Sequence, residues 1–549
     1  MNDRAGSRKH LFFVLLLAIA AFVVFSLWPS TTNREQPDTT DNTLHRGIGA
    51  APESFDFHKT VSVQASTVFR DLGEGLMGNT ASGELVPAAA ASWTLSEDQL
   101  TYTFTLHADN RWSNGETLTA NDFVFSFRRL VDPATAAVSS RSIGAVANAA
   151  AIMAGELPPA ELGVHAIDDL TLEITLEQPT PYFLSQLTYT GMFPLYAPAI
   201  EAHGDEHARP GTLVTNGPYQ LAAVATGSLI ELERNPYFRD SAGTAIDRVH
   251  YHVLVEPMSE YNRFRAGELH VTSSVPPNLF ASIKAQYPAA LRTAPSLGVY
   301  YYGLNVTREP FADNLALRQA LSMAVDRDVL VEKIVARGEQ VAYSFVPPGL
   351  PGYEPPQLPY HSMTQQERNA QAKRLYYSAG YSEENPARVE LRYNTSEEHQ
   401  AIALAIQSMW RDVLGVEVEL INEEFQVLLT NMRERKVTEV FRSSWNGDYP
   451  DAHTFLSILE SDAEWNLPGW QSEEFDALMQ RAANQADAKT RMRFLEEAER
   501  VLLAEQPLIP LYFYVSKHLV SPEIGGWEDN VLDYHYSHHL SLRAGVAGN

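Results

Sequence analysis

The hydrophobic pattern of residues 389–420 constrains the fold more than any other feature of the sequence. Apolar residues alternate with polar ones over residues 389–393 and again over 416–420, as they do in half-buried strands. Between these segments, apolar residues recur at the spacing of a helix face: Ile402, Ile406, Met409 and Val413. A strand, a helix and a strand in this order form a βαβ unit with parallel strands, so the sequence predicts an α/β fold for this region.

The rest of the chain has a mixed pattern with no short internal repeat. Alternation predicts strands over residues 100–106, 172–176 and 249–255, helical spacing predicts a second helical region over 314–337, and a Pro-rich loop follows at 347–359. At 549 residues the chain is long for a single core, and roughly 150 residues per domain indicates about three lobes.

The N-terminus has the pattern of a targeting element. Arg4, Arg8 and Lys9 precede an uncharged apolar run over residues 11–28. Such a run makes about 27 Å of helix, which is long for a signal peptide. Ala18-Ile19-Ala20 could be a cleavage site, but the apolar run continues past it. We therefore predict an uncleaved signal anchor at 1–29, in preference to a cleaved signal peptide, and a polar linker at 30–43, with the remaining chain outside the cytoplasm.

Composition excludes several classes of function. The 41 Lys and Arg residues against 68 Asp and Glu residues give a formal charge of -27, which repels phosphate backbones, so no nucleic-acid partner is expected. The absence of cysteine excludes disulfides, a lipid-modified cysteine and thiol chemistry. No G-x-S-x-G, P-loop or H-E-x-x-H sequence occurs, and we expect no enzymatic activity.

Three short motifs suggest a cofactor or a metal, but their contexts favour structural interpretations. The G-x-G-x-x-G match at 73–78 follows an expected helix, whereas a dinucleotide-binding turn follows a strand. The H-x-x-E-H match at 203–207 contains Gly204, so we expect a solvated loop; a zinc hydrolase using His203 and His207 is the enzyme alternative. The His-rich tail at 534–539 has no carboxylate or thiolate cluster nearby, and its alternation predicts a closing strand. No metal site and no cofactor are predicted.

Landmark segments spread over most of the chain carry a family resemblance. They include RWSNGETLTANDFVFSFRRLVDP at 111–133, TNGPYQL at 215–221, FADNLALRQALSMAVDRD at 311–328 and WNGDYPDAHTFL at 445–456. In this combination and order the sequence resembles the extracytoplasmic solute-binding proteins of peptide ABC importers, the oligopeptide-binding protein family. The resemblance covers roughly residues 46–527.

The resemblance implies an α/β, three-lobed architecture in which two lobes close on a ligand like a Venus flytrap and the third is an insertion into the first. The N-terminal membrane helix expected from the apolar run would precede it. Lobe I would comprise residues 44–74, 211–300 and 516–549, lobe II the insertion 75–210, and lobe III residues 301–515. An extended peptide would lie between the lobes and pair its backbone with strand-like segments.

A zwitterionic peptide buried in this way brings an ammonium and a carboxylate, and each needs a counter-charge. Asp448 matches the family aspartate that takes the ammonium; from the residues alone, the alternative is that Asp448 caps an Asn446-Gly447 turn. We expect this turn to aim Trp445 and Asp448 into the cleft. Of the residues that follow, Asp451 is expected to cap a helix and His453 to be a bystander in its first turn.

For the carboxylate, Arg442 and His399 match family residues. Arginine can bind a carboxylate through two hydrogen bonds, and histidine can assist if it is protonated. The alternatives are a surface charge at a strand end for Arg442 and an ordinary first-turn residue for His399. Phe425 and Trp445 are expected to wall the site, or else to belong to the core.

Three positions depart from the family pattern. Ser139 stands near a position where the family offers a tyrosine, Asn446 replaces a cysteine, and Val335 replaces a lysine, although Lys333 and Arg337 lie close by. These departures leave the peptide length and the carboxylate partner open, and a cell-wall tripeptide or another modified peptide is an alternative ligand.

The expected function is the substrate-binding component of an ABC-type oligopeptide importer, a monomer that hands its peptide to a permease in the inner membrane. It would be periplasmic, either tethered by the N-terminal helix or released after cleavage. The alternatives are a receptor for a metal chelate or a sugar, and a tethered sensor without a transport partner. Asp448 favours a peptide, because a neutral sugar has no ammonium.

Overall fold

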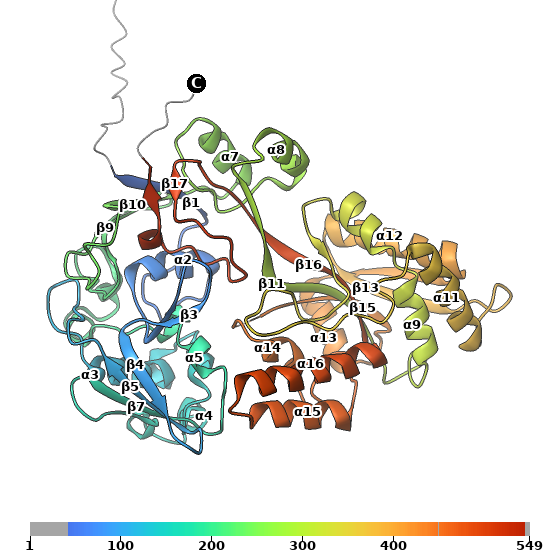
Figure 1. Ribbon diagram of the computed structural model, residues 1–549, viewed down its shortest axis with the longest axis horizontal. Coiled ribbons are helices and arrows are strands. Elements are labelled where there is room, and N and C mark those ends of the chain that lie inside the picture. The colour runs from blue at the N-terminus through green and yellow to red at the C-terminus, as the bar shows by residue number, and fades with distance from the viewer. Residues whose placement is uncertain (1–41, 448, 544–549) are drawn as a thin grey trace, which may run out of the picture. The chain divides into compact units, whose positions relative to one another are not determined.

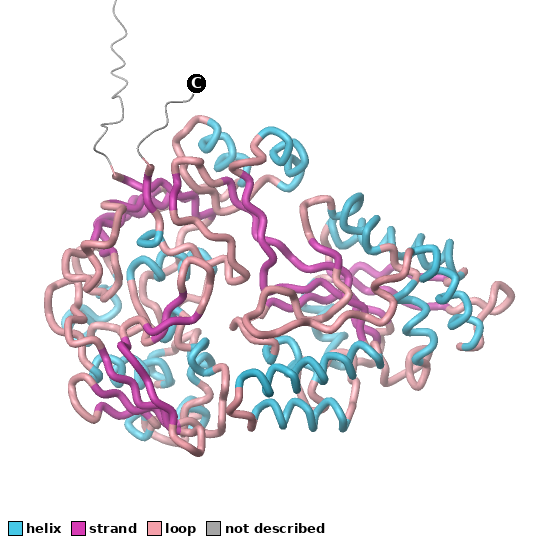
Figure 2. Tube along the Cα trace, in the orientation of Figure 1, coloured by secondary structure: helices cyan, strands magenta, loops and turns pink. Residues whose placement is uncertain are grey.

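The computed structural model describes residues 42–447 and 449–543, and three sheets form the framework of this part of the chain (Figure 1, Figure 2). The first sheet has the order β1 (Thr43–Gly49), β10 (Arg248–Val253), β9 (Leu229–Arg234), β8 (Tyr219–Ala225). The second has the order β4 (Ala90–Leu95), β5 (Thr101–Leu106), β7 (Thr171–Thr175), β6 (Val164–Ala166). The third has the order β12 (Gln340–Val341), β16 (Leu508–Leu519), β11 (Leu291–Leu304), β15 (Val440–Asn446), β13 (Arg388–Asn394), β14 (Glu417–Glu423).

Helices and two short strand pairs surround these sheets. The pairs are β2 (Met77–Asn79) with β3 (Leu85–Pro87), and β17 (Ile524–Gly525) with β18 (Ser541–Leu542). The longer helices are α2 (Val63–Leu72), α3 (Ala120–Val131), α7 (Pro257–Arg265), α9 (Leu315–Met323), α11 (Gln365–Ser378), α12 (Glu397–Leu414), α13 (Phe425–Glu434), α15 (Glu473–Ala483) and α16 (Ala488–Glu505). The shorter ones are α4 (Ala149–Met153), α5 (Phe183–Gln186), α6 (Ala197–His203), α8 (Phe280–Gln286), α10 (Arg327–Val329) and α14 (His453–Leu456).

The predicted βαβ unit is confirmed as β13, α12 and β14. The two strands are parallel, with Val389 opposite Val418. The helix begins at Glu397, before the first apolar residue of the pattern, because the Ser396 side chain accepts a hydrogen bond from the backbone of His399 and caps it. It ends at Gly415, whose φ of 77° suits a glycine.

Other predicted elements are confirmed with shifted ends. The three predicted strands are β5, β7 and β10, and β10 ends at Val253 rather than at residue 255. The helical region 314–337 is broken after α9, because the Asp326 side chain accepts a hydrogen bond from Val329 and starts a new helix, which continues as a π-helix over Leu330–Val335. The strand predicted at 534–539 is wrong, since this segment is a loop that ends in a 3-10 turn at Ser537–His539.

The strand β11 lies between two hydrophobic cores. Its residues alternate, so Tyr300 and Tyr302 pack into one core with α9, α11 and α12. Val299 and Tyr301 pack on the opposite face with α14, α15 and α16. The long strands β11 and β16 run across the predicted lobe borders at 300 and 515, and the lobe boundaries themselves stay a prediction.

The predicted anchor at 1–29, and the linker up to residue 41, lie outside the described residues. Among the helices of residues 42–447 and 449–543, none has both the length and the apolar character needed to cross a bilayer.

A buried carboxylate on α16 binds the two residues before the Pro-rich loop and one tyrosine within it. Glu499 Oε1 accepts hydrogen bonds from the backbone N–H groups of Phe345 (2.6 Å) and Val346 (2.9 Å), and the Tyr353 hydroxyl donates to Oε2. The Glu499 side chain is fully buried, and burial raises its pKa from the ordinary 4.5 to about 7.

The raised pKa of the Glu499 carboxyl group makes the stability of the protein depend on pH. Because the folded-state pKa of Glu499 is raised, its contribution is complete below about pH 4.5 and is lost as the pH rises through 7. Between pH 5 and 8 we expect wild type to lose roughly 3 kcal/mol of unfolding free energy relative to Glu499→Gln. Urea unfolding at four pH values measures this difference, with Glu497→Gln, a change at an exposed neighbour, as the control. Parallel pH profiles for wild type and Glu499→Gln would contradict the assignment.

Candidate ligand-binding site

Arg442 lies on β15 opposite Tyr302 of β11, and its guanidinium covers the ring of Tyr300 with Cζ 4.8 Å from the ring centroid. Nη1 donates to Asn394 Oδ1 at 3.4 Å, and Nε is buried without a hydrogen-bond partner in the described part of the chain. Burial alone would lower the pKa of Arg442, but the neighbouring Tyr300 and Tyr514 raise it. Arg442 is therefore a partly buried, permanently charged cation, and no carboxylate of residues 42–447 or 449–543 forms an ion pair with it.

His399, in the first turn of α12, also contacts Tyr300. Its Nδ1 lies 3.3 Å from the Tyr300 hydroxyl oxygen. Burial, followed by the charge of Arg442, lowers the pKa of His399 to about 4, so the ring is neutral at pH 7. The structure thus brings Arg442 and His399 together on either side of Tyr300. Sequence reasoning expected His399 to assist in its protonated form, but at neutral pH the ring needs a further nearby anion to be protonated.

Three more residues extend this group. Tyr512 of β16 stacks on Tyr300 with ring centroids 4.7 Å apart, and its hydroxyl donates to Glu398 Oε1 at 3.3 Å. Glu398 in turn pairs with Arg337. We call Tyr300, Tyr512, Arg442, His399, Glu398 and Arg337 the Tyr300 cluster. Figure 1 shows its elements, β11, β15, β16 and α12, gathered in one region.

Trp445 lies on the other face of the same strand. It stands opposite Val299 and packs against Trp465, with ring centroids 5.9 Å apart. Residues three apart on a strand point to opposite faces, which separates Trp445 from Arg442. Its Nε1 is buried without a hydrogen-bond partner in the described chain.

The predicted Asn-Gly turn is wrong. Asn446 is the last residue of β15 and pairs with Gly298, and the Gly447 N–H donates to the carbonyl of Leu297 at 2.8 Å. Neither Asn446 nor Gly447 has the positive φ that a two-residue hairpin turn of this type requires. The strand pairing therefore extends through Gly447. Asp448 lies outside the described residues.

Asp451 anchors the segment that follows. Its Oδ1 accepts from the backbone N–H of His453, the first residue of α14, at 2.9 Å, but the N-cap position of this helix is Ala452 rather than the predicted Asp451. The same carboxylate also binds Arg491 of α16 through two hydrogen bonds of 2.6 and 2.8 Å, both side chains being buried. No short sequence pattern indicates this ion pair, because its partners lie 40 positions apart.

His453 lies in the first turn of α14, as predicted, and makes specific ring contacts there. Its ring stacks on Tyr182, with centroids 4.5 Å apart, and its Nδ1 lies 2.9 Å from the Tyr449 hydroxyl oxygen. Tyr182 also stacks on Tyr449 at 4.5 Å with the rings 6° from parallel. Tyr182 belongs to the segment 75–210, so this stack joins the predicted insertion to the residues beside the candidate site.

The remaining predicted residues do not join the Tyr300 cluster. Phe425 begins α13 with 46% of its surface exposed. Ser139 is 4% exposed and packs against Gly191, with its Oγ buried and without a hydrogen-bond partner in the described chain. Val335 is buried in the core, and Lys333 is exposed.

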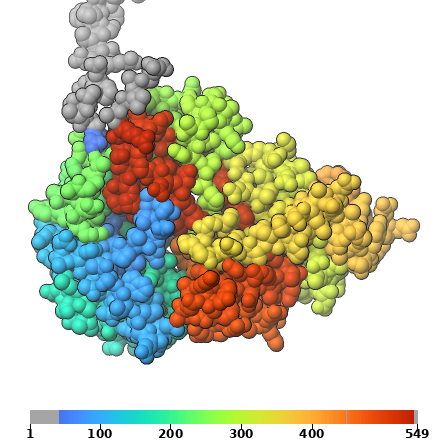
Figure 3. Space-filling view, viewed as in Figure 1, coloured from blue at the N-terminus to red at the C-terminus, as the bar shows by residue number. Residues whose placement is uncertain are grey.

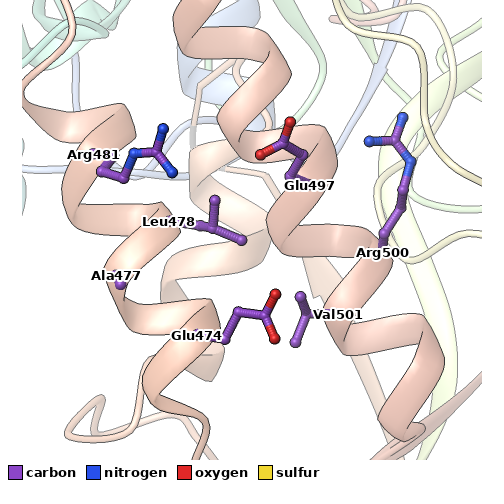
Figure 4. Close-up of a pocket in the computed structure, with 7 residues that line it drawn as sticks. All are labelled: Glu474, Ala477, Leu478, Arg481, Glu497, Arg500 and Val501. Atoms are coloured by element: carbon purple, nitrogen blue, oxygen red, sulfur yellow. The ribbon is translucent and has the colours of Figure 1, made fainter.

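Two other features lie away from the predicted site. A pocket of about 430 Å³ between α15 and α16 is lined by residues such as Glu474, Arg481 and Glu497, and none of the predicted site residues lines it (Figure 4). In the H-x-x-E-H segment, α6 ends at His203 and Gly204 has a φ of 55°, so no zinc-binding helix forms. His207 is buried beside Asp56 rather than solvated as predicted.

The α/β fold and its three sheets are those of a solute-binding protein, and sequence comparison defines the family. Residues 84–466 match the model of the bacterial extracellular solute-binding proteins, family 5 Middle. The chain belongs to this family.

Individual relatives agree with this assignment over almost the whole length. The periplasmic oligopeptide-binding protein OppA of Escherichia coli (strain K12) is 36% identical over 91% of this chain and 92% of its own. Among solved structures, the unliganded open form of the periplasmic murein tripeptide-binding protein MppA matches with a TM-score of 0.87 at 34% identity, covering 92% of this chain and 98% of its own. Haemophilus influenzae OppA in complex with RPPGFSPFR matches with a TM-score of 0.69 at 35% identity, covering 92% and 99%.

The Asp451–Arg491 pair predicts a large loss of stability on mutation. Asp451→Asn leaves the Arg491 charge buried and uncompensated, which costs about 3–5 kcal/mol of unfolding free energy. Urea unfolding measures the loss, and Asp462→Asn, a change at an exposed position of the same region, is the matched control. Equal midpoints for the two variants would contradict a structural role for the pair.

Proposed function

We propose that this chain is the periplasmic substrate-binding component of an ABC-type oligopeptide importer. Family membership supports a solute-binding role, and the relatives named for oligopeptide and murein tripeptide binding support a peptide as the solute. In this proposal lobes I and III close over an extended peptide, with lobe II inserted into lobe I, and the monomer delivers the peptide to an inner-membrane permease without chemical change. The N-terminal helix holds the protein at the membrane or is removed by cleavage.

The observation that carries the peptide assignment is the state of Arg442. A partly buried guanidinium with no carboxylate partner among the described residues favours an anion from outside the chain. Neutral His399, 3.3 Å from the hydroxyl of the intervening Tyr300, can take up a proton when that anion arrives. We assign the peptide carboxylate to Arg442 and His399, and the peptide ammonium to Asp448. Trp445, Asn446, Gly447, Phe425 and Ser139 stay proposed contacts to the peptide.

The ligand itself tests the function. Native mass spectrometry of protein released from cells without denaturation should show a series of masses that tandem sequencing identifies as peptides. A single sugar, a metal chelate or a non-peptide lipid in their place would overturn the proposal.

A thermodynamic cycle tests the assignment of the two charges. We expect N-acetylation of tri- and tetra-alanine to weaken binding to wild type by about 10- to 100-fold, because a charge-assisted hydrogen bond contributes about 1.5–3 kcal/mol. In Asp448→Asn the free and acetylated peptides should bind with affinities within about threefold of each other. Isothermal titration calorimetry measures each corner of the cycle.

The opposite terminus supplies the control for this cycle. C-terminal amidation should weaken binding to wild type and to Asp448→Asn by the same factor, and should lose its effect in Arg442→Gln. If Asp448→Asn keeps the full penalty for acetylation, Asp448 does not bind the ammonium.

His399 predicts a pH dependence of affinity. A carboxylate beside the ring raises its pKa from about 4, so binding takes up a proton and tightens as the pH falls. We expect affinity for tri-alanine to rise roughly tenfold more between pH 7.5 and 5 in wild type than in His399→Gln. His203→Gln, at an exposed position, should follow wild type. Identical profiles in wild type and His399→Gln would exclude this role.

A further inference from the structure

Three side chains from two parts of the chain converge beside the end of β16. His518 belongs to β16, and Asp533 and His535 belong to the C-terminal segment, whose red atoms lie on the visible face in Figure 3. His518 Nε2 lies 2.8 Å from Asp533 Oδ1, and His535 Nε2 lies 3.1 Å from the same oxygen. One ligand atom of each residue falls within 4.8 Å of the other two.

The hydrogen bonds of His518 fix the direction of its lone pair. Its Nδ1 lies 2.8 Å from the carbonyl oxygen of Thr272, and a carbonyl can only accept, so Nδ1 carries the proton. In the neutral ring Nε2 is then an acceptor that faces the Asp533 carboxylate, which is also an acceptor. A cation between them removes this conflict, and it is either a second proton on the ring or a metal ion. A histidine that donates its other N–H to a backbone carbonyl is the usual arrangement of a metal ligand.

The surroundings hold His535 in place. Its ring stacks on Trp527 with centroids 3.6 Å apart, and Arg46 Nη1 donates to its carbonyl oxygen at 2.8 Å. Arg46 also donates to Ser537 Oγ at 2.9 Å. Both the ring and the backbone of this residue are therefore oriented before any ligand binds.

The geometry suits a small divalent cation with nitrogen and oxygen ligands. Zinc at about 2.0–2.2 Å from each ligand in a tetrahedron places those ligands about 3.3–3.5 Å apart. The 2.8 and 3.1 Å separations reach this value with shifts of a few tenths of an ångström. A cavity of about 290 Å³, lined in part by His518, Asp533 and Ser273, gives the ion a path and leaves room for a water as fourth ligand. The cations that line this cavity are neutralised, since Lys517 pairs with Glu339 and Arg337 with Glu398.

We propose that His518, Asp533 and His535 bind one Zn²⁺ ion, which fastens the C-terminal segment to β16. From the sequence alone, no metal site is expected at the His-rich tail, because no carboxylate or thiolate cluster accompanies it. In the structure Asp533 lies beside the tail, and His518 comes from a strand 15 residues before Asp533. The site involves none of the residues assigned to the peptide, so it stands or fails separately from the proposed function.

Zinc binding to the whole chain tests this site. Untagged protein is stripped with a chelator, dialysed against defined free Zn²⁺ at pH 7.5, and analysed by elemental mass spectrometry. We expect one zinc per chain in wild type and at least a 100-fold loss of affinity in His535→Gln and in Asp533→Asn. No stoichiometric zinc in wild type would overturn the proposal. The cation between His518 and Asp533 would then be a second proton on the His518 ring.

Two control variants make the test specific. His203→Gln removes an exposed histidine, and His252→Gln removes one of the histidines that contact His45 on the first sheet. Both should bind zinc as wild type does. If affinity follows His252 instead of His535, the proposed ligands are wrong. Zinc-edge X-ray absorption of the wild-type complex gives an answer that needs no folded variant, because it should show two imidazoles and oxygen ligands.

Discussion

The pairing of β11 between β15 and β16 is the constraint on which the candidate site depends. It places Tyr300 opposite Ser444 on one side and opposite Tyr512 on the other. A slip of one residue would turn Tyr300 to the opposite core, because side chains alternate along a strand. The pairing with β16 is irregular between Tyr300 and Tyr301, and such bulges redirect side chains near functional sites. Arg442 and His399 meet only because this register holds Tyr300 between them.

Local patterns predicted the fold better than they predicted the site. The βαβ unit follows from the apolar spacing of residues 389–420, because each element buries one face and its period is visible in the sequence. The predicted Asn446-Gly447 turn is wrong because it rested on the local preference of a dipeptide. Pairing with Gly298 and Leu297 of the distant strand β11 extends β15 instead. Tertiary pairing overrides a two-residue preference.

Long-range partners explain the residues that sequence reasoning missed. Tyr512 is 212 positions from Tyr300, and Arg491 is 40 positions from Asp451, so no short pattern joins either pair. The family resemblance nominated Arg442 and His399, which the structure brings together. It gave no indication that His399 is neutral, because the pKa depends on burial and on the neighbouring Arg442 charge. It also could not show that Trp445 leaves β15 on the opposite face.

The stack of Tyr182 on Tyr449 and His453 gives a free energy with which the contribution of a bound ligand can be compared. Each aromatic contact contributes about 0.5–1.5 kcal/mol beyond its buried area, so the two ring contacts of Tyr182 together contribute about 1–3 kcal/mol beyond that area. Two charge-assisted hydrogen bonds to a peptide, at about 1.5–3 kcal/mol each, exceed that sum. A ligand that bridges the segments can therefore govern their association, whereas a neutral solute that makes only ring contacts cannot supply the same differential free energy. On the proposed assignment, the charged peptide termini are therefore the groups that supply this free energy.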